Sequence, residues 1–182
     1  MEGGPPMNRR ALAAAPLLLL AAPAAAQLKM PPSKMAAKWY AVLVEDKAFT
    51  VEMPGVPDHR LLNDASARGT AFTLHSYSLD LAGYSYVVQT ALYPADVDVA
   101  QPRAILQAAL EGRASNLDGR KWASVAWKDV QGATAAESAG SVRGLVLRQL
   151  VLLKGRRFAS LAVLGPPGPE ADRFLKSLKL SA

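Results

Sequence analysis

The most apolar part of the chain is a pair of runs rich in Val and Leu, Val146–Leu153 and Phe158–Leu164. They are separated by the polar segment Lys154–Arg157, and this pattern predicts a β-hairpin. Gly155 can adopt the positive φ that a two-residue type II′ turn at Gly155-Arg156 requires. Because both sides of each run are mainly apolar, we expect the hairpin to lie in the middle of a sheet that is covered on both faces.

The turn also fixes the strand register. One side of the hairpin is predicted to pair Leu153 with Phe158, Val151 with Ser160 and Gln149 with Ala162. The other side is predicted to pair Leu152 with Ala159, Leu150 with Leu161 and Arg148 with Val163. Arg148 would then lie among apolar neighbours, so it needs a carboxylate partner or an opening to solvent.

The remaining periodicity predicts further strands and two helices. Alternating or short apolar runs bounded by turn residues predict strands at Trp39–Val44, Ala48–Met53, Thr70–Leu81, Tyr84–Tyr93, Lys121–Val130 and Ala133–Ser138. An apolar stripe predicts a helix over Arg103–Leu117, and a second, closing helix is expected over Glu170–Leu178. The polar stretch Asp58–Gly69 is interpreted as a loop with at most one helical turn. The fold class is therefore α+β, an antiparallel sheet flanked by helices.

Two tryptophans bear on the packing of the later strands. Trp122 and Trp127 are five positions apart, so in a regular strand their side chains point to opposite faces. We expect at least one of the two to be buried.

The first 26 residues have the features of a cleavable signal peptide. Asn8-Arg9-Arg10 is a short basic region, Ala11–Ala22 is apolar, and Ala24-Ala25-Ala26 fits cleavage before Gln27. We expect translation to begin at Met7, because the preceding acidic and proline residues add nothing that a signal peptide uses. Arg9-Arg10 fits the general secretory route and also leaves the twin-arginine route open. Residues 27–38 are expected to form a flexible linker, and residues 39–182 a single domain in the periplasm or outside the cell.

Composition restricts the chemistry of this domain. The chain has no cysteine, which excludes disulfides, thiolate metal sites and a cysteine nucleophile. Its formal net charge is +6, so an acidic protein partner or an anionic component of the envelope is a reasonable ligand. Export argues against nucleic acid as a partner. The cleaved leader leaves no segment that would span a membrane, and oligomeric state cannot be read from the sequence.

Several segments resemble a known family. These are Phe49–Pro57, the strand Tyr84–Pro94, the hairpin Leu147–Gly165 and the ending Phe174–Leu180. Together they resemble the PsbP-like group of bacterial exported proteins, whose Mog/PsbP-type fold is an α/β/α sandwich. The resemblance implies an antiparallel sheet between helices, in agreement with the order of elements above. It implies no reaction, because the group includes photosystem accessory proteins, a Ran-binding relative and many exported proteins of unknown role.

No residue set specifies a catalytic or metal site. The two histidines, His59 and His75, lack the spacing of a metal-binding motif, so we interpret them as surface or hydrogen-bonded side chains. No nucleophile motif surrounds a serine, and no glycine-rich loop has the order that binds phosphate. We therefore expect no catalytic residue, no metal and no cofactor.

The basic hairpin turn is the one candidate binding site. Lys154 and Arg157 are predicted to be cross-strand neighbours of like charge, with Arg156 beside them. Together with Arg148 they are the candidate residues for an acidic partner or an anion. The alternative is a solvated turn whose charges prevent aggregation.

Three functions remain open at this point. The leading hypothesis is a non-catalytic binding or accessory domain of the cell envelope. A small hydrolytic enzyme without metal or cysteine is the second, and a carrier of an apolar ligand, suggested by the aromatic strand Tyr84–Tyr93, is the third.

Overall fold

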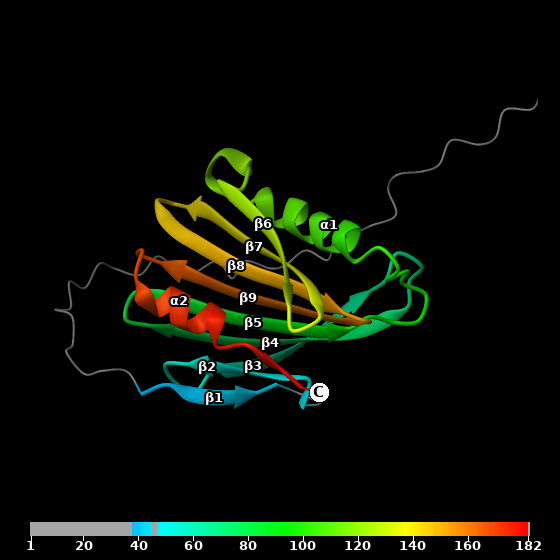
Figure 1. Ribbon diagram of the computed structural model, residues 1–182, viewed down its shortest axis with the longest axis horizontal. Coiled ribbons are helices and arrows are strands. Elements are labelled where there is room, and N and C mark those ends of the chain that lie inside the picture. The colour runs from blue at the N-terminus through cyan, green and yellow to red at the C-terminus, as the bar shows by residue number, and fades with distance from the viewer. Residues whose placement is uncertain (1–37, 45–46, 182) are drawn as a thin grey trace, which may run out of the picture.

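The computed structural model describes residues 38–44 and 47–181 (Figure 1). The expected signal peptide and all but Lys38 of the expected linker lie outside the described residues. The described elements are strands β1 (Tyr40–Leu43), β2 (Phe49–Met53), β3 (Asp58–Ala65), β4 (Ala71–Leu81) and β5 (Tyr84–Leu92), helix α1 (Pro102–Ala114), the 3-10 turn η2 (Asp118–Arg120), strands β6 (Ser124–Val130), β7 (Ala133–Val142), β8 (Leu145–Lys154) and β9 (Arg157–Gly165), helix α2 (Pro169–Lys176) and strand β10 (Lys179–Leu180).

Two antiparallel sheets organise the chain. The larger sheet has seven strands in the order β3-β4-β5-β9-β8-β7-β6, and the smaller has the order β1-β2-β10. The predicted hairpin of β8 and β9 lies in the middle of the larger sheet, and its register is the predicted one, from Arg148 opposite Val163 to Lys154 opposite Arg157. Gly155 has a φ of 55° at the turn, as the turn type requires.

The larger sheet is covered on both faces (Figure 1). On one face, called here the α1 face, Leu106 and Leu110 of helix α1 pack in one cluster with Val151 and Phe158 of the central hairpin. On the other, the α2 face, Phe174 of helix α2 packs with Tyr86, Leu150 and Leu161, and the small sheet adds Phe49, Val51 and Met53 to the same cluster. The predicted α+β class, with a sheet flanked by helices, is confirmed.

The interpretation of Asp58–Gly69 as a loop is wrong. Residues Asp58–Ala65 form β3, which pairs along its whole length with β4. This strand is at the edge of the sheet and most of its side chains are exposed, so it lacks the apolar alternation that identifies a half-buried strand.

The expectation that the two tryptophans point to opposite faces is wrong, and both side chains are partly buried. Strand β6 begins at Ser124, so Trp122 lies before it and is free of strand alternation. Both Trp122 and Trp127 pack against the cluster on the α1 face. Trp122 is fixed there because its indole Nε1 donates a hydrogen bond to the carbonyl oxygen of Leu110 in α1, at 2.9 Å.

Helix lengths bear on membrane insertion. Within residues 38–44 and 47–181, no helix has both the length and the apolar character needed to cross a membrane.

Candidate ligand-binding groove

A groove of about 560 Å³ opens at the end of the sheet where the turn between β8 and β9 lies. Its floor is a row of cross-strand neighbours: Thr73 of β4 is level with Leu92 of β5, which pairs with Arg157 of β9. The remaining lining residues are Ala71, Phe72, His75, Tyr93, Pro94, Ala95 and Arg156. We call this the hairpin-tip groove. Two of the four candidate binding residues from the sequence, Arg156 and Arg157, line it.

Arg156 is held against Tyr93 from two directions. The backbone N–H of Tyr93 donates to the carbonyl oxygen of Arg156 at 2.9 Å, and Arg156 Nε donates to the carbonyl oxygen of Tyr93 at 2.9 Å. Arg156 Nη2 is buried without a hydrogen-bond partner among the described residues. The guanidinium is thus fixed on one side and unsatisfied on the other, which is the arrangement expected of a group that binds an anion.

Aromatic rings form the apolar part of the groove. Tyr93 meets Phe72 edge to face, with ring centroids 5.6 Å apart, and lies 5.9 Å from the ring of Phe158. Burial, and to a lesser extent the Asp64 carboxylate, raise the pKa of Tyr93 to about 12. The phenol therefore stays neutral at physiological pH and adds no negative charge to the groove.

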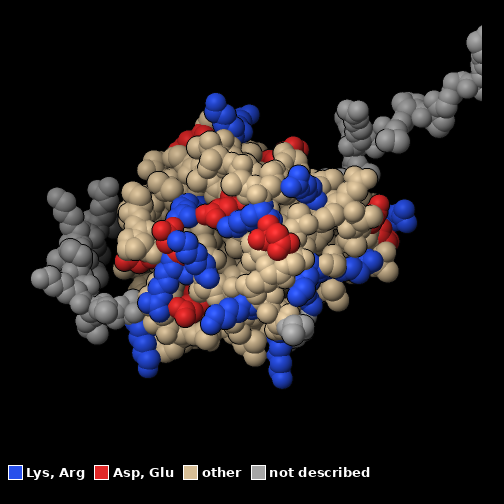
Figure 2. Space-filling view, in the orientation of Figure 1, with Lys and Arg blue, Asp and Glu red and all other residues tan. Residues whose placement is uncertain are grey.

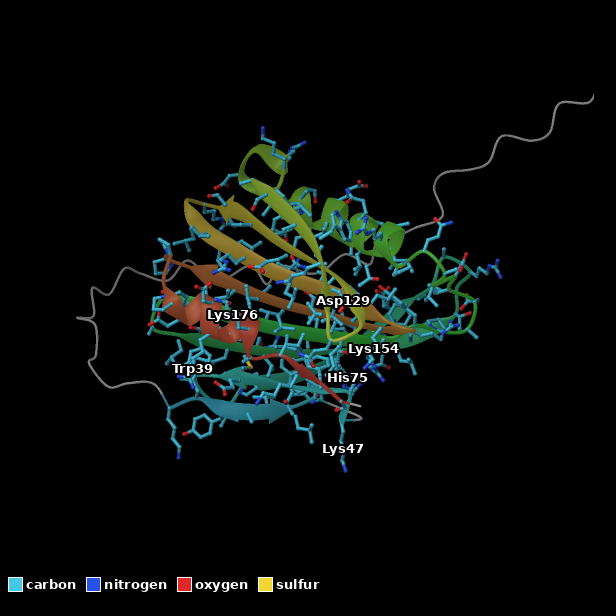
Figure 3. The ribbon with its side chains drawn as sticks, in the orientation of Figure 1. Trp39, Lys47, His75, Asp129, Lys154 and Lys176 are labelled. Atoms are coloured by element: carbon cyan, nitrogen blue, oxygen red, sulfur yellow. The ribbon has the colours of Figure 1, made fainter. Side chains whose placement is uncertain are left out.

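Lys154 does not line the groove. It is opposite Arg157 in the register, as predicted, but its Nζ donates to the carbonyl oxygen of Ser181 near the C-terminus at 3.3 Å. Burial lowers the pKa of Arg157, whose guanidinium is half-buried. Figure 3 places Lys154 and His75 at the same end of the sheet. Lys154 therefore adds positive charge near the groove without being part of its wall.

His75 connects the groove to the edge of the sheet. Its Nδ1 lies 3.2 Å from Nε2 of His59 on β3, so one imidazole donates a hydrogen bond to the other. The ring of His59 also stacks on Tyr77, with centroids 4.3 Å apart. The interpretation of the histidines as hydrogen-bonded side chains is confirmed for this pair.

Arg148 is remote from the groove and has partners of its own. It lies on the α2 face of β8, where its Nη2 donates to Glu137 Oε1 at 2.7 Å and its Nη1 pairs with Asp172 of helix α2. The requirement for a carboxylate partner is therefore met twice. The hydrogen bond from Arg148 lowers the pKa of Asp172. Arg148 joins α2 to the sheet and is not brought together with the hairpin tip.

A metal site or a catalytic site needs side chains that converge on one point. Within the described part of the chain, no group of three His, Cys, Asp or Glu side chains is placed to hold a metal ion. Each histidine makes its side-chain hydrogen bond with the other, and no serine hydroxyl in this part is hydrogen-bonded to either.

The surface charge is mixed but mainly basic. Figure 2 shows Lys and Arg side chains outnumbering Asp and Glu on the face turned to the viewer. Several of these cations are paired, such as Arg173 with Glu52 and Lys128 with Glu137. Exposed pairs of this kind are weak and screened by salt.

Comparison with known proteins bears on the fold. No protein-family model matches the chain, and no curated protein matches its sequence. The structure is similar to the solution structure of cyanobacterial PsbP (CyanoP) from Synechocystis sp., with a TM-score of 0.52 over 85% of this chain and 99% of that chain. The fold is PsbP-like. At 10% sequence identity the likeness establishes the fold alone. This PsbP-like fold agrees with what the sequence resemblance implied.

Proposed function

We propose that the chain is an exported, non-catalytic binding or accessory domain of the cell envelope, and that it holds an anionic group of a partner in the hairpin-tip groove. The basic leader and the cleavage sequence before Gln27 support export. The PsbP-like fold is compatible with such a role. The single observation on which the proposal depends is the buried, unpartnered Nη2 of Arg156, a residue that lines the groove together with Arg157.

The lining defines the chemistry of the ligand. Arg156 and Arg157 supply positive charge on one side, and Phe72, Leu92 and Pro94 supply apolar surface on the other. Leu92 is 54% exposed, which is a large apolar area to leave in water beside two arginines. A carboxylate would pair with the arginines, and a neighbouring apolar side chain would cover the apolar side of the groove. The expected occupant is therefore an acidic segment of a partner protein.

Site-specific crosslinking in cells tests this function. A photo-crosslinking amino acid is placed at Ala71, on the lining of the groove, and a matched one at Ser124, on the exposed opposite edge strand. We expect a specific crosslinked product from position 71 that disappears in the Arg156→Gln, Arg157→Gln double variant. Equal products from both positions, or a product unaffected by the double variant, would reject the groove as the partner site.

The carrier hypothesis has less support. The aromatic side chains of β5 that suggested it are used in the core: Tyr86 meets Phe174 edge to face at 5.3 Å and Trp39 at 6.1 Å. These contacts leave Tyr86 only 2% exposed. An apolar ligand would have to bind elsewhere, and the groove with its two arginines is better suited to an anionic one.

A further inference from the structure

Four polar side chains form a row across the α1 face of the sheet, inside the core. They come from adjacent strands and each is at most 4% exposed: Gln89 of β5, Ser160 of β9, Gln149 of β8 and Ser138 of β7. The register places Gln89 opposite Ser160 and Gln149 opposite Ser138. Gln149 Nε2 donates to Ser160 Oγ at 3.0 Å. We call this set the buried polar row.

The row separates two apolar clusters on the same face. Val151 lies two positions after Gln149 on β8 and packs under helix α1 with Ala136 and Phe158. Leu147 lies two positions before Gln149 and packs with Leu117 and Ala162. On β8 the row therefore contains Gln149 alone, with an apolar side chain before it and another after it on the same face.

Arg113 of helix α1 is one of the side chains that the helix buries, and its level along the sheet can be inferred from that of Leu117. A Cβ added to Gly140 of β7 would be 2.9 Å from Leu117 Cδ1, so Leu117 sits directly on Gly140. The N–H of Leu117 donates to the carbonyl oxygen of Ala114 at 3.1 Å, so helical geometry continues past the end of α1. Along the helix axis, Arg113 lies about 6 Å from Leu117, four residues earlier. Along strand β7, Ser138 lies about 7 Å from Gly140, two residues earlier. Leu110, further back along α1, packs in one cluster with Ala136 of β7, so the helix follows the strand in this direction. We therefore infer that Arg113 is level with Ser138.

The polar atoms here are not satisfied by the protein. Arg113 is 8% exposed, its Nε has no hydrogen-bond partner, and no ion pair within the described residues includes it. Gln89 Oε1, Gln149 Oε1 and Ser138 Oγ are also buried without partners. Burial lowers the pKa of Arg113 to about 10, which leaves it cationic at neutral pH. A buried cation without a counter-charge is costly, so the fold is expected to provide one.

We propose that Arg113 and the buried polar row bind a small inorganic anion between helix α1 and the sheet. A small ion is proposed because an organic molecule would have to displace the apolar side chains that flank the row. Rotating the Gln149 amide turns its Nε2 toward the ion, and the Ser160 hydroxyl then donates to Oε1, so the bond between the two residues is kept. Arg113 Nε, a glutamine N–H and the Ser138 hydroxyl then act as donors to the ion.

Bromide is the probe for this site. Thermal unfolding of the purified protein is followed as sodium bromide replaces the sodium salt of a large organic anion at constant ionic strength. A ligand of the folded state raises the unfolding midpoint in a saturable way, so the wild-type midpoint is expected to rise by several degrees. The same rise is expected in Arg103→Met, an exposed arginine of the same helix. It should be absent in Arg113→Met.

Two results overturn the proposal. One is a wild-type midpoint that does not respond to bromide, or an equal response in Arg113→Met. The other comes from the wild-type protein alone and so does not depend on whether the variant folds. In crystals soaked in sodium bromide, an anomalous peak is expected within hydrogen-bonding distance of Arg113 Nε. Ordered water alone at that position would overturn the proposal.

Discussion

Arg156 and Tyr93 are joined by two hydrogen bonds across 63 positions of sequence, one from the backbone of Tyr93 and one from the side chain of Arg156, both at 2.9 Å. The pair ties the turn between β8 and β9 to the segment that follows β5. It also fixes the orientation of the guanidinium, and so determines where the unpartnered Nη2 lies. A single contact thereby contributes both to the fold and to the geometry of the hairpin-tip groove.

Arg156→Lys tests the structural half of this relationship. Lysine keeps the charge but has no Nε–H in the position that contacts the Tyr93 carbonyl. We expect the free energy of unfolding in urea to fall by about 1 kcal/mol, the usual contribution of one hydrogen bond. Arg60→Lys, on the exposed edge strand β3, is the matched control and should change stability little. Equal effects at the two positions would show that the Arg156 contact contributes nothing.

Much of the fold could be predicted because its central hairpin has a strong local signal. Val146–Leu153 and Phe158–Leu164 are long apolar runs with Gly155 between them, and the turn type fixed every pairing found in β8 and β9. Strand β3 could not be predicted in the same way, because an exposed edge strand buries little and therefore has no apolar period. Its partnership with β4 is a property of the whole sheet.

The sequence predicted only part of the lining of the groove. The basic turn drew attention to Arg156 and Arg157 through the charge of neighbouring residues. Phe72 and Leu92 had no signal of their own, because they meet the turn only through the register of β4, β5 and β9. Tyr93 was noted only as part of the aromatic strand that suggested an apolar ligand. Lys154 and Arg148 were grouped with the turn by charge, yet one contacts the C-terminal segment and the other an ion-pair network under α2.

The Arg148 network predicts how stability depends on pH. Hydrogen bonding to Arg148 lowers the pKa of Asp172. Burial alone would raise the pKa of Glu137, but hydrogen bonds from Lys128 and Arg148 lower it overall. A carboxyl group whose pKa is lower in the folded state stabilises the fold above its unfolded pKa, and this stability is lost as pH falls through the folded value.

Arg148→Met should therefore be less stable than wild type at pH 7, by about 1 to 2 kcal/mol, and the difference should shrink as pH falls from about 5 to 3. Urea unfolding at a series of pH values measures this. Arg173→Met breaks the exposed pair with Glu52 and is expected to cost less than about 1 kcal/mol. A difference for Arg148→Met that stays constant or grows toward acid pH would contradict the role of the two carboxylates.

Gly165 is a position where a side chain does not fit. A Cβ there would lie 2.4 Å from Cδ1 of Tyr84 and 2.9 Å from its Cε1, so the ring must move. Gly165→Ala is expected to destabilise the protein by about 1 to 3 kcal/mol, as overpacking does. At Gly140 the nearest atom is the end of the flexible Leu117 side chain, so Gly140→Ala should cost less. Thermal unfolding of both variants provides the comparison, and a reversed order would contradict the close contact at Tyr84.

The central claim is that the hairpin-tip groove, and not the general basic surface, binds an anionic partner. Titration of the ¹⁵N-labelled protein with a hexaglutamate peptide at physiological salt tests it most directly. We predict saturable amide shifts concentrated at Thr73, Leu92, Tyr93 and Arg157, and an affinity at least about tenfold lower in the Arg156→Gln, Arg157→Gln variant. Shifts that spread instead over helix α2 with its Arg173 and Lys176, weaken uniformly with salt and survive in the double variant would contradict the account.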